Sequence, residues 1–341
     1  MKRGDASQPP PHWIFILLVM IDFISATISG CKDTINFSNL VLESENIKYN
    51  RTYYAIDGCE EMQLIIIHNT GDIRLKGSVP YYYQGNNFTF DRKKFVQAID
   101  YINTITNIDF WQSDLDEFEY GVIMEVPTTP RNYIIHHTAK RGEKLLQNER
   151  GRDKGKFRWW EDKTLSLKLY DAGRNIKAKQ SENRKQVIRN AGWDDDKEYI
   201  KFEIHYKKPH LCLNNGRAMK LYCLANPTWE DRLKEDLFEQ YQRLNPYKEI
   251  TIPTDKKNFG TPNIYAHTLT ELAINMDYSP EDVKGLLYNT INNATTTLSK
   301  SDKDARKREV TKIQGTLLTP TESQWDLRNN LQEAINKTNT P

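Results

Sequence analysis

The spacing of apolar and polar side chains predicts several β-strands in the first third of the chain. Residues 20–29 have the composition of an opening strand, and residues 62–68 contain the uninterrupted apolar run of a fully buried one. Residues 72–78 and 81–90 are expected to be further strands, with a turn between pairing segments at residues 85–87. Together these segments indicate a sheet that is built early in the chain.

A helix is expected to follow these strands. Asp91 has a suitable side chain to cap it, and Phe95, Ile99 and Ile102 then recur at helical spacing. A helix that crosses back over antiparallel strands is typical of the α+β class. The sequence therefore predicts an α+β fold with a central, largely antiparallel sheet, helices packed on one face and a helical C-terminal region.

Three later segments alternate apolar and polar residues over most of their length: residues 117–126, 164–170 and 199–207. Successive side chains of a strand point to opposite faces, so each segment has one apolar and one polar face. If the three strands share a sheet and turn their apolar faces to the helix, their polar faces form one surface. The residues expected to carry chemistry on that surface are Glu119, Lys168, Tyr170 and Glu203.

The composition changes near residue 245. Thr228 is expected to cap a helix that continues through Tyr241, and helices are expected beyond the change at residues 268–276 and from Ser279 onwards. Two helices joined by a short turn fit a simple helical hairpin or a DNA-binding helix-turn-helix. The expected units are an N-terminal extension (1–19), a principal domain (20–245), a linker (246–263) and a helical C-terminal region (264–341).

Positive charge is concentrated in one segment of a chain whose formal net charge is only +2. Residues 140–189 contain 16 Lys and Arg against 7 Asp and Glu, an excess of nine positive charges. Such a segment indicates a polyanion partner or, alternatively, a solvated loop. Lys and Arg neutralise phosphates and aromatic rings stack on unpaired bases, so nucleic-acid contacts are expected here. The candidate contact residues are Arg152, Lys154, Lys156, Arg158, Trp159, Lys201 and Lys207.

The N-terminus permits two interpretations. A basic start, a short apolar run at residues 13–20 and small residues before Cys31 are typical of a bacterial lipoprotein signal. Asp22 interrupts the apolar stretch with a charge, which favours the second interpretation, translation from Met20 into a β-strand. The apolar run is too short to span a bilayer. The four cysteines have neither CxxC nor zinc-ligand spacing, as expected of free thiols in a reducing compartment.

A tyrosine, acidic groups and a lysine on one surface form the set required for attack on a phosphodiester. A free phenol titrates near pH ~10 and is a weak nucleophile at neutrality. A divalent cation or a neighbouring ammonium stabilises the charge in transfer, and Mg²⁺ and Mn²⁺ prefer carboxylate oxygens. In this interpretation Tyr170 is the nucleophile, Lys168 assists it, and Glu119 and Glu203 bind the metal. The alternative is an ordinary set of solvent-facing strands.

Three short motifs, in the same order along the chain, carry a family resemblance. The segment 199–208 (YIKFEIHYKK) resembles the strand (L/V)-R-F-E-x-(K/R)-x-K of the filamentous-phage gene II/X replication initiators and the related initiation factors of rolling-circle plasmids. Residues 168–171 (KLYD) are similar to the family's Y-(D/L)-K strand, and residues 118–121 (FEYG) occupy the place of its R-(I/L)-(D/E) strand. The opening at Met20 also resembles the start of these proteins, and the resemblance covers roughly residues 20–245.

This resemblance implies a rolling-circle DNA replication initiator, and therefore an enzyme. Such an initiator cuts one origin strand through its tyrosine, here Tyr170, keeps a 5′-phosphotyrosine, leaves a free 3′-hydroxyl and later rejoins the strand. The resemblance further implies Mg²⁺ or Mn²⁺ as the cofactor and single-stranded or melted origin DNA as the partner. Host helicase and polymerase are further expected partners, in the bacterial cytoplasm and without membrane association.

Several positions depart from the family's pattern. Ala172 stands where the family has a lysine two residues after the tyrosine, so Lys168 or Arg174 would have to replace it. Lys168 is the better placed of the two, because it shares a strand face with the tyrosine. Glu117 and Lys201 stand where the family has arginines. These departures raise the alternative of a non-catalytic, DNA-binding regulatory relative.

The predicted metal site lacks a third ligand. Glu125 lies on the polar face of its strand and Asp171 adjoins the tyrosine, so each is a candidate. His136 and His137 are adjacent and would point to opposite sides of a strand, which favours ordinary loop histidines over metal ligands. A third functional hypothesis, a lipoprotein anchored at Cys31, follows from the N-terminal pattern alone.

Overall fold

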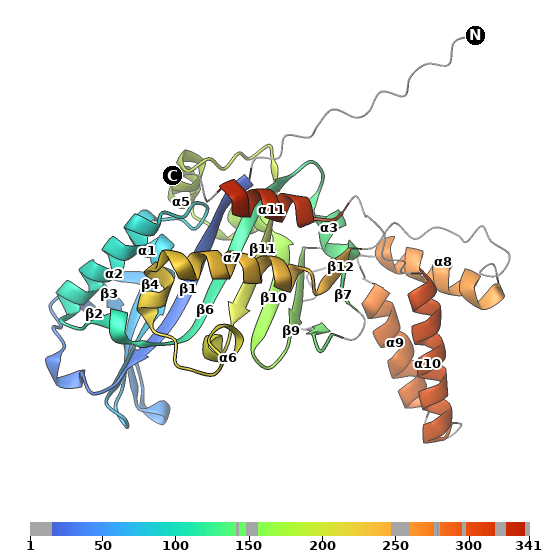
Figure 1. Ribbon diagram of the computed structural model, residues 1–341, viewed down its shortest axis with the longest axis horizontal. Coiled ribbons are helices and arrows are strands. Elements are labelled where there is room, and N and C mark those ends of the chain that lie inside the picture. The colour runs from blue at the N-terminus through green and yellow to red at the C-terminus, as the bar shows by residue number, and fades with distance from the viewer. Residues whose placement is uncertain are drawn as a thin grey trace, which may run out of the picture.

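The centre of the computed structural model is one large antiparallel sheet (Figure 1). The sheet has ten strands in the order β2-β3-β4-β5-β1-β6-β11-β10-β9-β8, and every adjacent pair is antiparallel. β7 and β12 form a separate two-stranded sheet. The structure describes residues 16–140, 143–147, 156–246, 260–275, 278, 280–294, 298–317 and 325–337.

Strands and helices together confirm the expected α+β fold. The strands are β1 (Ile16–Ile28), β2 (Leu40–Asn46), β3 (Arg51–Ile56), β4 (Cys59–Ile67), β5 (Asp72–Gly77), β6 (Asp114–Val126), β7 (His137–Ala139), β8 (Leu146–Gln147), β9 (Phe157–Glu161), β10 (Leu165–Asp171), β11 (Glu198–Tyr206) and β12 (Leu244–Pro246). The helices are α1 (Val79–Gln84), α2 (Arg92–Thr106), α3 (Pro130–His136), α4 (Ala172–Lys179), α5 (Glu182–Asn190), α6 (Pro209–Leu213), α7 (Pro227–Tyr241), α8 (Thr261–Asn275), α9 (Pro280–Asn293), α10 (Lys300–Leu317) and α11 (Arg328–Lys337).

One face of the sheet carries the main hydrophobic core. The three alternating segments lie side by side as β6, β11 and β10, and their apolar residues, such as Phe118, Leu167 and Phe202, are buried in it. α2, α7 and α11 add residues such as Ile99 and Leu237 to the same core, and α7 and α11 lie across the front of the sheet in Figure 1. Because side chains alternate along a strand, the polar faces of the three strands coincide on the other side.

That other face is also partly covered, which the sequence did not predict. α4 and α5 follow β10 and pack over a second, smaller core that includes Met20, Ile123, Ile188 and Trp193. α4 also borders a cavity whose floor is formed by polar residues of β6, β10 and β11. The helices are therefore not confined to one face of the sheet, and the second group supplies a wall beside the polar surface.

Residues 81–90 do not form the expected strand, because α1 occupies the first part of this segment. The Ser78 hydroxyl accepts a hydrogen bond from the backbone N–H of Tyr81, and Pro80 lies in the first turn. Gly85 ends the helix with a φ of 73°. A serine cap, an early proline and a left-handed glycine are helix signals, and here they outweigh the β-propensity of the consecutive tyrosines.

α2 and α7, the two longer helices over the main core, are each capped at the N-terminus by a side-chain oxygen. Asp91 caps α2 as expected, because its carboxylate accepts hydrogen bonds from the backbone N–H groups of Lys93 and Lys94. α7 is capped by Asn226 and not by Thr228, whose own backbone N–H donates to the Asn226 side chain at 2.9 Å. The helix therefore begins two residues before the position expected from the sequence.

The C-terminal region divides into two parts. α8, α9 and α10 pack on one another and project from the main sheet, and the Tyr288 and Thr311 hydroxyls join α9 to α10 at 2.5 Å (Figure 1). α11 instead returns to the sheet, where its residues Leu331 and Ala334 and the preceding Leu327 are buried in the main core. The unit expected at residues 264–341 is therefore not a single body, since its last helix belongs to the principal domain.

β1 bears on the interpretation of the N-terminus. It pairs with β5 on one side and β6 on the other, and Met20 is fully buried. Cleavage before Cys31, as the lipoprotein hypothesis requires, would remove this whole strand from the middle of the sheet. None of the helices in the described part of the chain has the length and apolar character needed to cross a membrane.

Candidate active site

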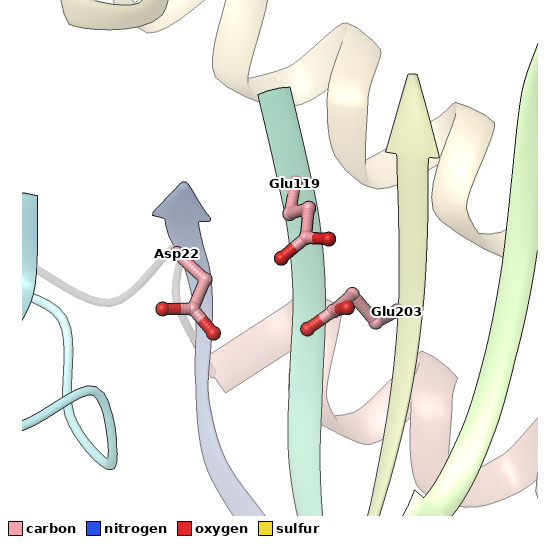
Figure 2. A group of neighbouring side chains, drawn as sticks. All are labelled: Asp22, Glu119 and Glu203. Carbon is pink, nitrogen blue, oxygen red and sulfur yellow. The ribbon is translucent and has the colours of Figure 1, made fainter. Parts of the chain in front are cut away.

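Three carboxylates from three adjacent strands meet on the polar face of the sheet (Figure 2). Asp22 comes from β1, Glu119 from β6 and Glu203 from β11. One oxygen of each carboxylate lies within 4.8 Å of one oxygen of each of the others. Asp22 is 8% exposed and Glu203 is 2% exposed, so the cluster is largely withdrawn from water.

The register of β6 and β11 places two of these carboxylates together. Glu203 pairs with Gly121, and His205 pairs with Glu119. A Cβ atom at Gly121 would lie 2.6 Å from the Phe202 carbonyl oxygen, which is too close for any other residue unless β11 shifts. The glycine therefore permits the close approach of the two strands that sets the position of Glu203.

Two lysines neutralise the carboxylate cluster. The Lys201 ammonium lies 2.5 Å from Asp22 Oδ2 and 2.6 Å from Glu203 Oε2. The Lys168 ammonium lies 2.5 Å from Glu119 Oε1 and 3.1 Å from Glu203 Oε1. Burial disfavours both ammonium charges, but the neighbouring carboxylates outweigh it and raise the pKa of Lys201 and of Lys168. Positive and negative groups therefore alternate across the strands, and both lysines share Glu203.

His205 adds another group to the alternating positive and negative side chains, next to two carboxylates of β6. Burial opposes the charge on His205, but its bonds to Glu117 and Glu119 outweigh it and raise the pKa of the imidazole to about 9. Burial likewise opposes ionisation of Glu119, whereas the bonds to His205 and Lys168 lower the pKa of that carboxyl to about 2. At neutral pH His205 is therefore a cation between two carboxylates.

Tyr170 lies at the edge of the carboxylate cluster. Its hydroxyl donates a hydrogen bond to Glu203 Oε2 at 3.3 Å, and the Lys201 ammonium lies 5.8 Å from the centre of its ring. Burial and the Glu203 carboxylate raise the pKa of Tyr170 well above its ordinary value, so the group is a neutral phenol at pH 7. To act as a nucleophile it needs a proton acceptor, a position that Glu203 occupies, and positive charge on the group it attacks.

The cluster opens into a cavity of about 960 Å³ between the sheet and α4. Ligand sites commonly occupy about 300–1,000 Å³, so the cavity has room for a nucleotide-sized group. Its walls combine the acids with many basic and aromatic side chains. The basic and aromatic residues of the wall are Tyr81, Lys156, Phe157, Trp159, Lys168, Tyr170, Arg174, Lys179, His205 and Lys207.

The structure brings together the four residues that the sequence selected for chemistry. Hydrogen bonds of 3.3 Å or less join Lys168 to Glu119 and to Glu203, and Tyr170 to Glu203. Their proximity follows from the antiparallel register, in which Lys168 pairs with Glu203 and Tyr170 with Lys201. Their catalytic and metal-binding roles stay predictions.

The predicted nucleic-acid contacts fall into three groups. Lys156, Trp159 and Lys207 line the cavity. Arg152 and Lys154 lie outside the described residues. The remaining two, Arg158 and Lys201, are buried.

Arg158 and Lys201 are not placed as surface contacts to DNA. Arg158 is 3% exposed and lies on the core face of β9 together with Trp160, because alternate residues of a strand share a face. Lys201 is 1% exposed, and its ammonium is held between Asp22 and Glu203. The expectation was wrong for Arg158, and Lys201 belongs to the ion-pair network instead.

Asp22 is the third acidic residue, which the sequence analysis did not assign. Glu125 pairs with Lys197 at 2.9 Å, and Asp171 caps α4 by accepting a hydrogen bond from the Arg174 backbone N–H, so neither alternative joins the cluster. A signal for Asp22 was present in the sequence, namely one charged residue inside an otherwise apolar strand. Its partners lie in other strands, so the pattern alone did not connect it to the site.

Two further local features were invisible in the sequence. Asn87 donates a hydrogen bond to Asp22 at 2.7 Å and Ser78 donates another at 3.2 Å, and both residues flank α1, where strands had been expected. Ala172 begins α4 and packs in the second core. The position where the resembled initiators have a lysine is therefore not on the strand face here. The Lys201 ammonium lies 5.8 Å from the centre of the Tyr170 ring, and Lys168 shares the partner Glu203 with the tyrosine.

Comparison with known proteins does not assign the chain to a family. No protein-family model matches it, and no curated protein matches it. The geometry of the site and the motifs of the sequence are therefore the grounds for a functional proposal.

The donor set of the cluster fits a hard divalent cation. Mg²⁺ and Mn²⁺ take oxygen ligands, and three carboxylates within 4.8 Å of one another supply them from rigid strands. The Lys201 ammonium contacts two of the three carboxylates, so a bound cation and this ammonium would compete for the same oxygens. The acidic triad can hold a metal ion, and binding would displace some of the contacts between its carboxylates and Lys201.

Proposed function

We propose that this protein is a metal-dependent DNA nicking-closing enzyme that initiates rolling-circle replication. One observation carries the proposal: a tyrosine hydroxyl lies at hydrogen-bond distance from one of three clustered carboxylates, in a cavity with basic and aromatic walls. A tyrosine nucleophile, acidic ligands and an ammonium are the groups that phosphodiester transesterification requires. The order of the motifs along the chain supports the same assignment.

In the proposed reaction the Tyr170 oxygen attacks the scissile phosphorus of one DNA strand. A bond forms between the phenolic oxygen and phosphorus, and the bond between phosphorus and the 3′ oxygen breaks, which leaves a 5′-phosphotyrosine. Glu203 lies at hydrogen-bond distance to accept the phenolic proton, and it returns this proton through water to the departing 3′ oxygen. One ester replaces another, so attack by a 3′-hydroxyl in the reverse direction rejoins the strand without ATP.

Asp22, Glu119 and Glu203 would hold Mg²⁺ or Mn²⁺ in this enzyme. When bound, the cation neutralises charge on the attacked phosphate. Lys168 has an 18% exposed side chain that lines the cavity, whereas that of Lys201 is only 2% exposed. Lys168 is therefore the ammonium placed to contact the phosphate, and Lys201 the one that holds the carboxylates in position.

The walls of the cavity support DNA as the partner. Lys156, Arg174, Lys179 and Lys207 supply positive charge, and Trp159 supplies an aromatic ring. The substrate in this proposal is origin DNA in single-stranded or melted form. Host helicase and polymerase, in the bacterial cytoplasm, would then use the 3′-hydroxyl that the cut releases.

The proposal is tested on a supercoiled plasmid that carries the DNA surrounding the coding sequence, with Mg²⁺ or Mn²⁺ added. We expect open circular DNA with the protein attached covalently to the 5′ end of the cut strand. Tyr170→Phe should abolish the adduct, because it removes the nucleophilic oxygen and keeps the ring. Tyr53→Phe, on β3 and outside the cavity, is the matched control and should form the adduct normally.

A normal adduct from Tyr170→Phe would make the assignment of the nucleophile wrong, and Tyr81, which also lines the cavity, would be examined next. Glu203→Gln should remove nicking and weaken Mn²⁺ binding at least about tenfold in calorimetry, because it removes a carboxylate oxygen. DNA binding without nicking would support the second candidate, a non-catalytic DNA-binding protein. The ion pairs that already neutralise the three carboxylates are the observation that favours this second candidate.

A further inference from the structure

Two buried hydrogen-bond donors on the wall of the cavity have no partner among the described residues. Ser166 is 0% exposed, and its hydroxyl makes no hydrogen bond to any described residue although Ser166 lines the cavity. The indole N–H of Trp159, on the adjacent strand, is also buried and unpartnered, and Trp159 lines the same cavity. A buried donor without an acceptor lowers stability, so such groups point to a ligand that completes them.

The two donors lie to one side of the reactive tyrosine. Trp159 on β9 pairs with Lys168 on β10, and Ser166 precedes Lys168 by two residues on the same face of the strand. Tyr170 follows Lys168 by two residues, so the order along the face is tyrosine, lysine, serine. Along the strand Ser166 therefore lies about 7 Å from Lys168 and about 13 Å from Tyr170. The shorter span is of the order of the separation of consecutive phosphates along an extended nucleotide chain, with the attacked phosphate at the level of Lys168 and the next one at Ser166.

The charged groups around Ser166 are occupied by contacts to one another. His205 and Glu161 are its neighbours in register on β11 and β9. His205 is bonded to two carboxylates of β6, and Glu161 lies 2.6 Å from the Lys207 ammonium. The unsatisfied donors of this region are therefore the neutral hydroxyl and the neutral indole N–H. A ligand that fits them brings hydrogen-bond acceptors, as a phosphate does.

We propose that Ser166 and Trp159 form a subsite for the phosphate next to the scissile one, and that this subsite sets the register of the DNA strand over Tyr170. The inference rests on the proposed function, since it takes the attacked phosphate to lie beside the tyrosine and the carboxylates. Hydrogen bonds from neutral side chains to phosphates position a nucleic acid without reading its sequence. Ser166 and Trp159 are thus positioning residues, and their loss should leave the metal site intact.

The test measures binding of fluorescein-labelled, single-stranded dT12 to the full chain by fluorescence anisotropy. Ser166→Ala and Trp159→Phe should each raise the Kd about fivefold, because each removes one donor to phosphate, and phenylalanine keeps an aromatic ring. Ser25→Ala is the matched control. Ser25 is also 0% exposed with an unpartnered hydroxyl in the same sheet, but it does not line the cavity. Its Kd should equal that of the wild type.

A second measurement separates binding from folding. Removal of an unsatisfied buried hydroxyl should not destabilise the fold, so Ser166→Ala should unfold at or above the wild-type Tm while it binds dT12 more weakly. Where the covalent adduct forms, Ser166→Ala should also spread the cut over neighbouring phosphates when the cut ends are mapped. A merely structural serine would move neither the Kd nor the position of the cut.

The possible results test the phosphate subsite and the proposed nicking activity separately. If Ser166→Ala binds dT12 as tightly as the wild type, the subsite is refuted, whether or not Tyr170 forms an adduct. If the variants bind more weakly but no adduct ever forms, the phosphate subsite stands and the nicking proposal fails. If the wild-type protein does not bind dT12 at concentrations up to about 100 µM, which reaches the weak end of the usual range of non-specific DNA affinities, both fail.

Discussion

At the scale of single residues, Lys201 is a buried cation that joins two of the three clustered carboxylates. Its side chain is 2% exposed, and its ammonium contacts the carboxylates of Asp22 and Glu203. Removal of one member of a buried ion pair leaves the other charges without compensation and commonly costs about 3–5 kcal/mol. The stability of the fold and the affinity of the metal site are therefore coupled through this one lysine.

Lys201→Met should lower the free energy of unfolding by about 3 kcal/mol in the absence of metal. Mn²⁺ should then raise the Tm of the variant more than that of the wild type, because the cation no longer competes with the ammonium. Thermal unfolding with and without Mn²⁺ measures both effects. Lys197→Met, which breaks the more exposed pair with Glu125, is the control and should cost no more than about 1 kcal/mol. Equal Mn²⁺ effects in Lys201→Met and wild type would contradict the coupling.

His137 gives the stability a pH dependence that does not involve the site. It was expected to be an ordinary loop histidine, but it is fully buried, and its two ring nitrogens lie 2.6 Å from the Tyr133 carbonyl and 2.8 Å from the Tyr241 hydroxyl. Burial lowers the pKa of His137 to about 4, whereas an unfolded histidine titrates near 6.5. Between these values the unfolded chain binds more protons, so stability is complete above about pH 6.5 and falls as the pH falls towards 4.

The loss between pH 6.5 and pH 4 should reach about 3 kcal/mol from this one residue. Urea unfolding at several pH values measures it. His137→Gln, which keeps a donor and an acceptor but does not titrate, should show a flatter dependence over the same range. An unchanged slope in that variant would assign the pH dependence to other groups.

At the scale of elements, the site is a product of strand register. β6, β11 and β10 are adjacent and antiparallel, so residues far apart in the chain meet on the polar face. Lys168 lies opposite Glu203, and Glu119 lies opposite His205, two residues further along β11. Gly121 makes this register possible, since a Cβ there would lie 2.6 Å from a backbone carbonyl and 2.9 Å from the Glu203 Cα. The spacing of β6 and β11 and the geometry of the acidic triad therefore depend on the same residue.

Gly121→Ala should lower the free energy of unfolding by about 1–3 kcal/mol, because the added methyl group has no room between the two backbones. It should also weaken Mn²⁺ binding, since the displaced strand carries Glu203. Chemical unfolding and calorimetry with Mn²⁺ measure the two effects. Gly285→Ala in α9 is the matched control. Nothing lies within 4 Å of its added Cβ, so the change should be neutral or stabilising by about 0.5–1 kcal/mol, with normal Mn²⁺ affinity.

At the scale of the whole molecule, the last helix completes the principal domain. α8 to α10 form their own group, but α11 packs against β1, β6 and α7 and so lies on the same strands that carry Asp22 and Glu119 (Figure 1). Trp325 and Leu331 are buried in the main core. Truncation of the chain at the end of α7 would therefore expose the core behind the site and not simply remove an appendage.

Leu331→Ala should lower the free energy of unfolding of the sheet domain by about 2–5 kcal/mol, as expected for a fully buried leucine. Leu272→Ala, at a 54% exposed position of α8, is the control and should stay within about 0.5 kcal/mol of the wild type. Unfolding followed by tryptophan fluorescence measures both. If both variants change the free energy of unfolding by the same small amount, α11 does not unfold cooperatively with the sheet domain.

The sequence by itself determined the faces of the strands and, with them, most of the site. Alternation in residues 117–126, 164–170 and 199–207 depends only on local chain geometry, so the common polar surface and the candidates on it could be predicted. The capped helix at Asp91 and the helical C-terminal region could be predicted for the same reason. The prediction of a strand at residues 81–90 was wrong, because the signals for a helix at this segment are short and compete with the strong β-propensity of its tyrosines.

Only the tertiary structure decided which strands become neighbours. β1 lies between β5 and β6, and this brings Asp22 to Glu119 and Glu203 across 97 and 181 positions of sequence. The burial of Arg158 and Lys201, the wall formed by α4 and the return of α11 are also long-range results. No local pattern contains them, because they depend on how the whole chain closes its core, and the energy of each contact exists only once its distant partner is in place.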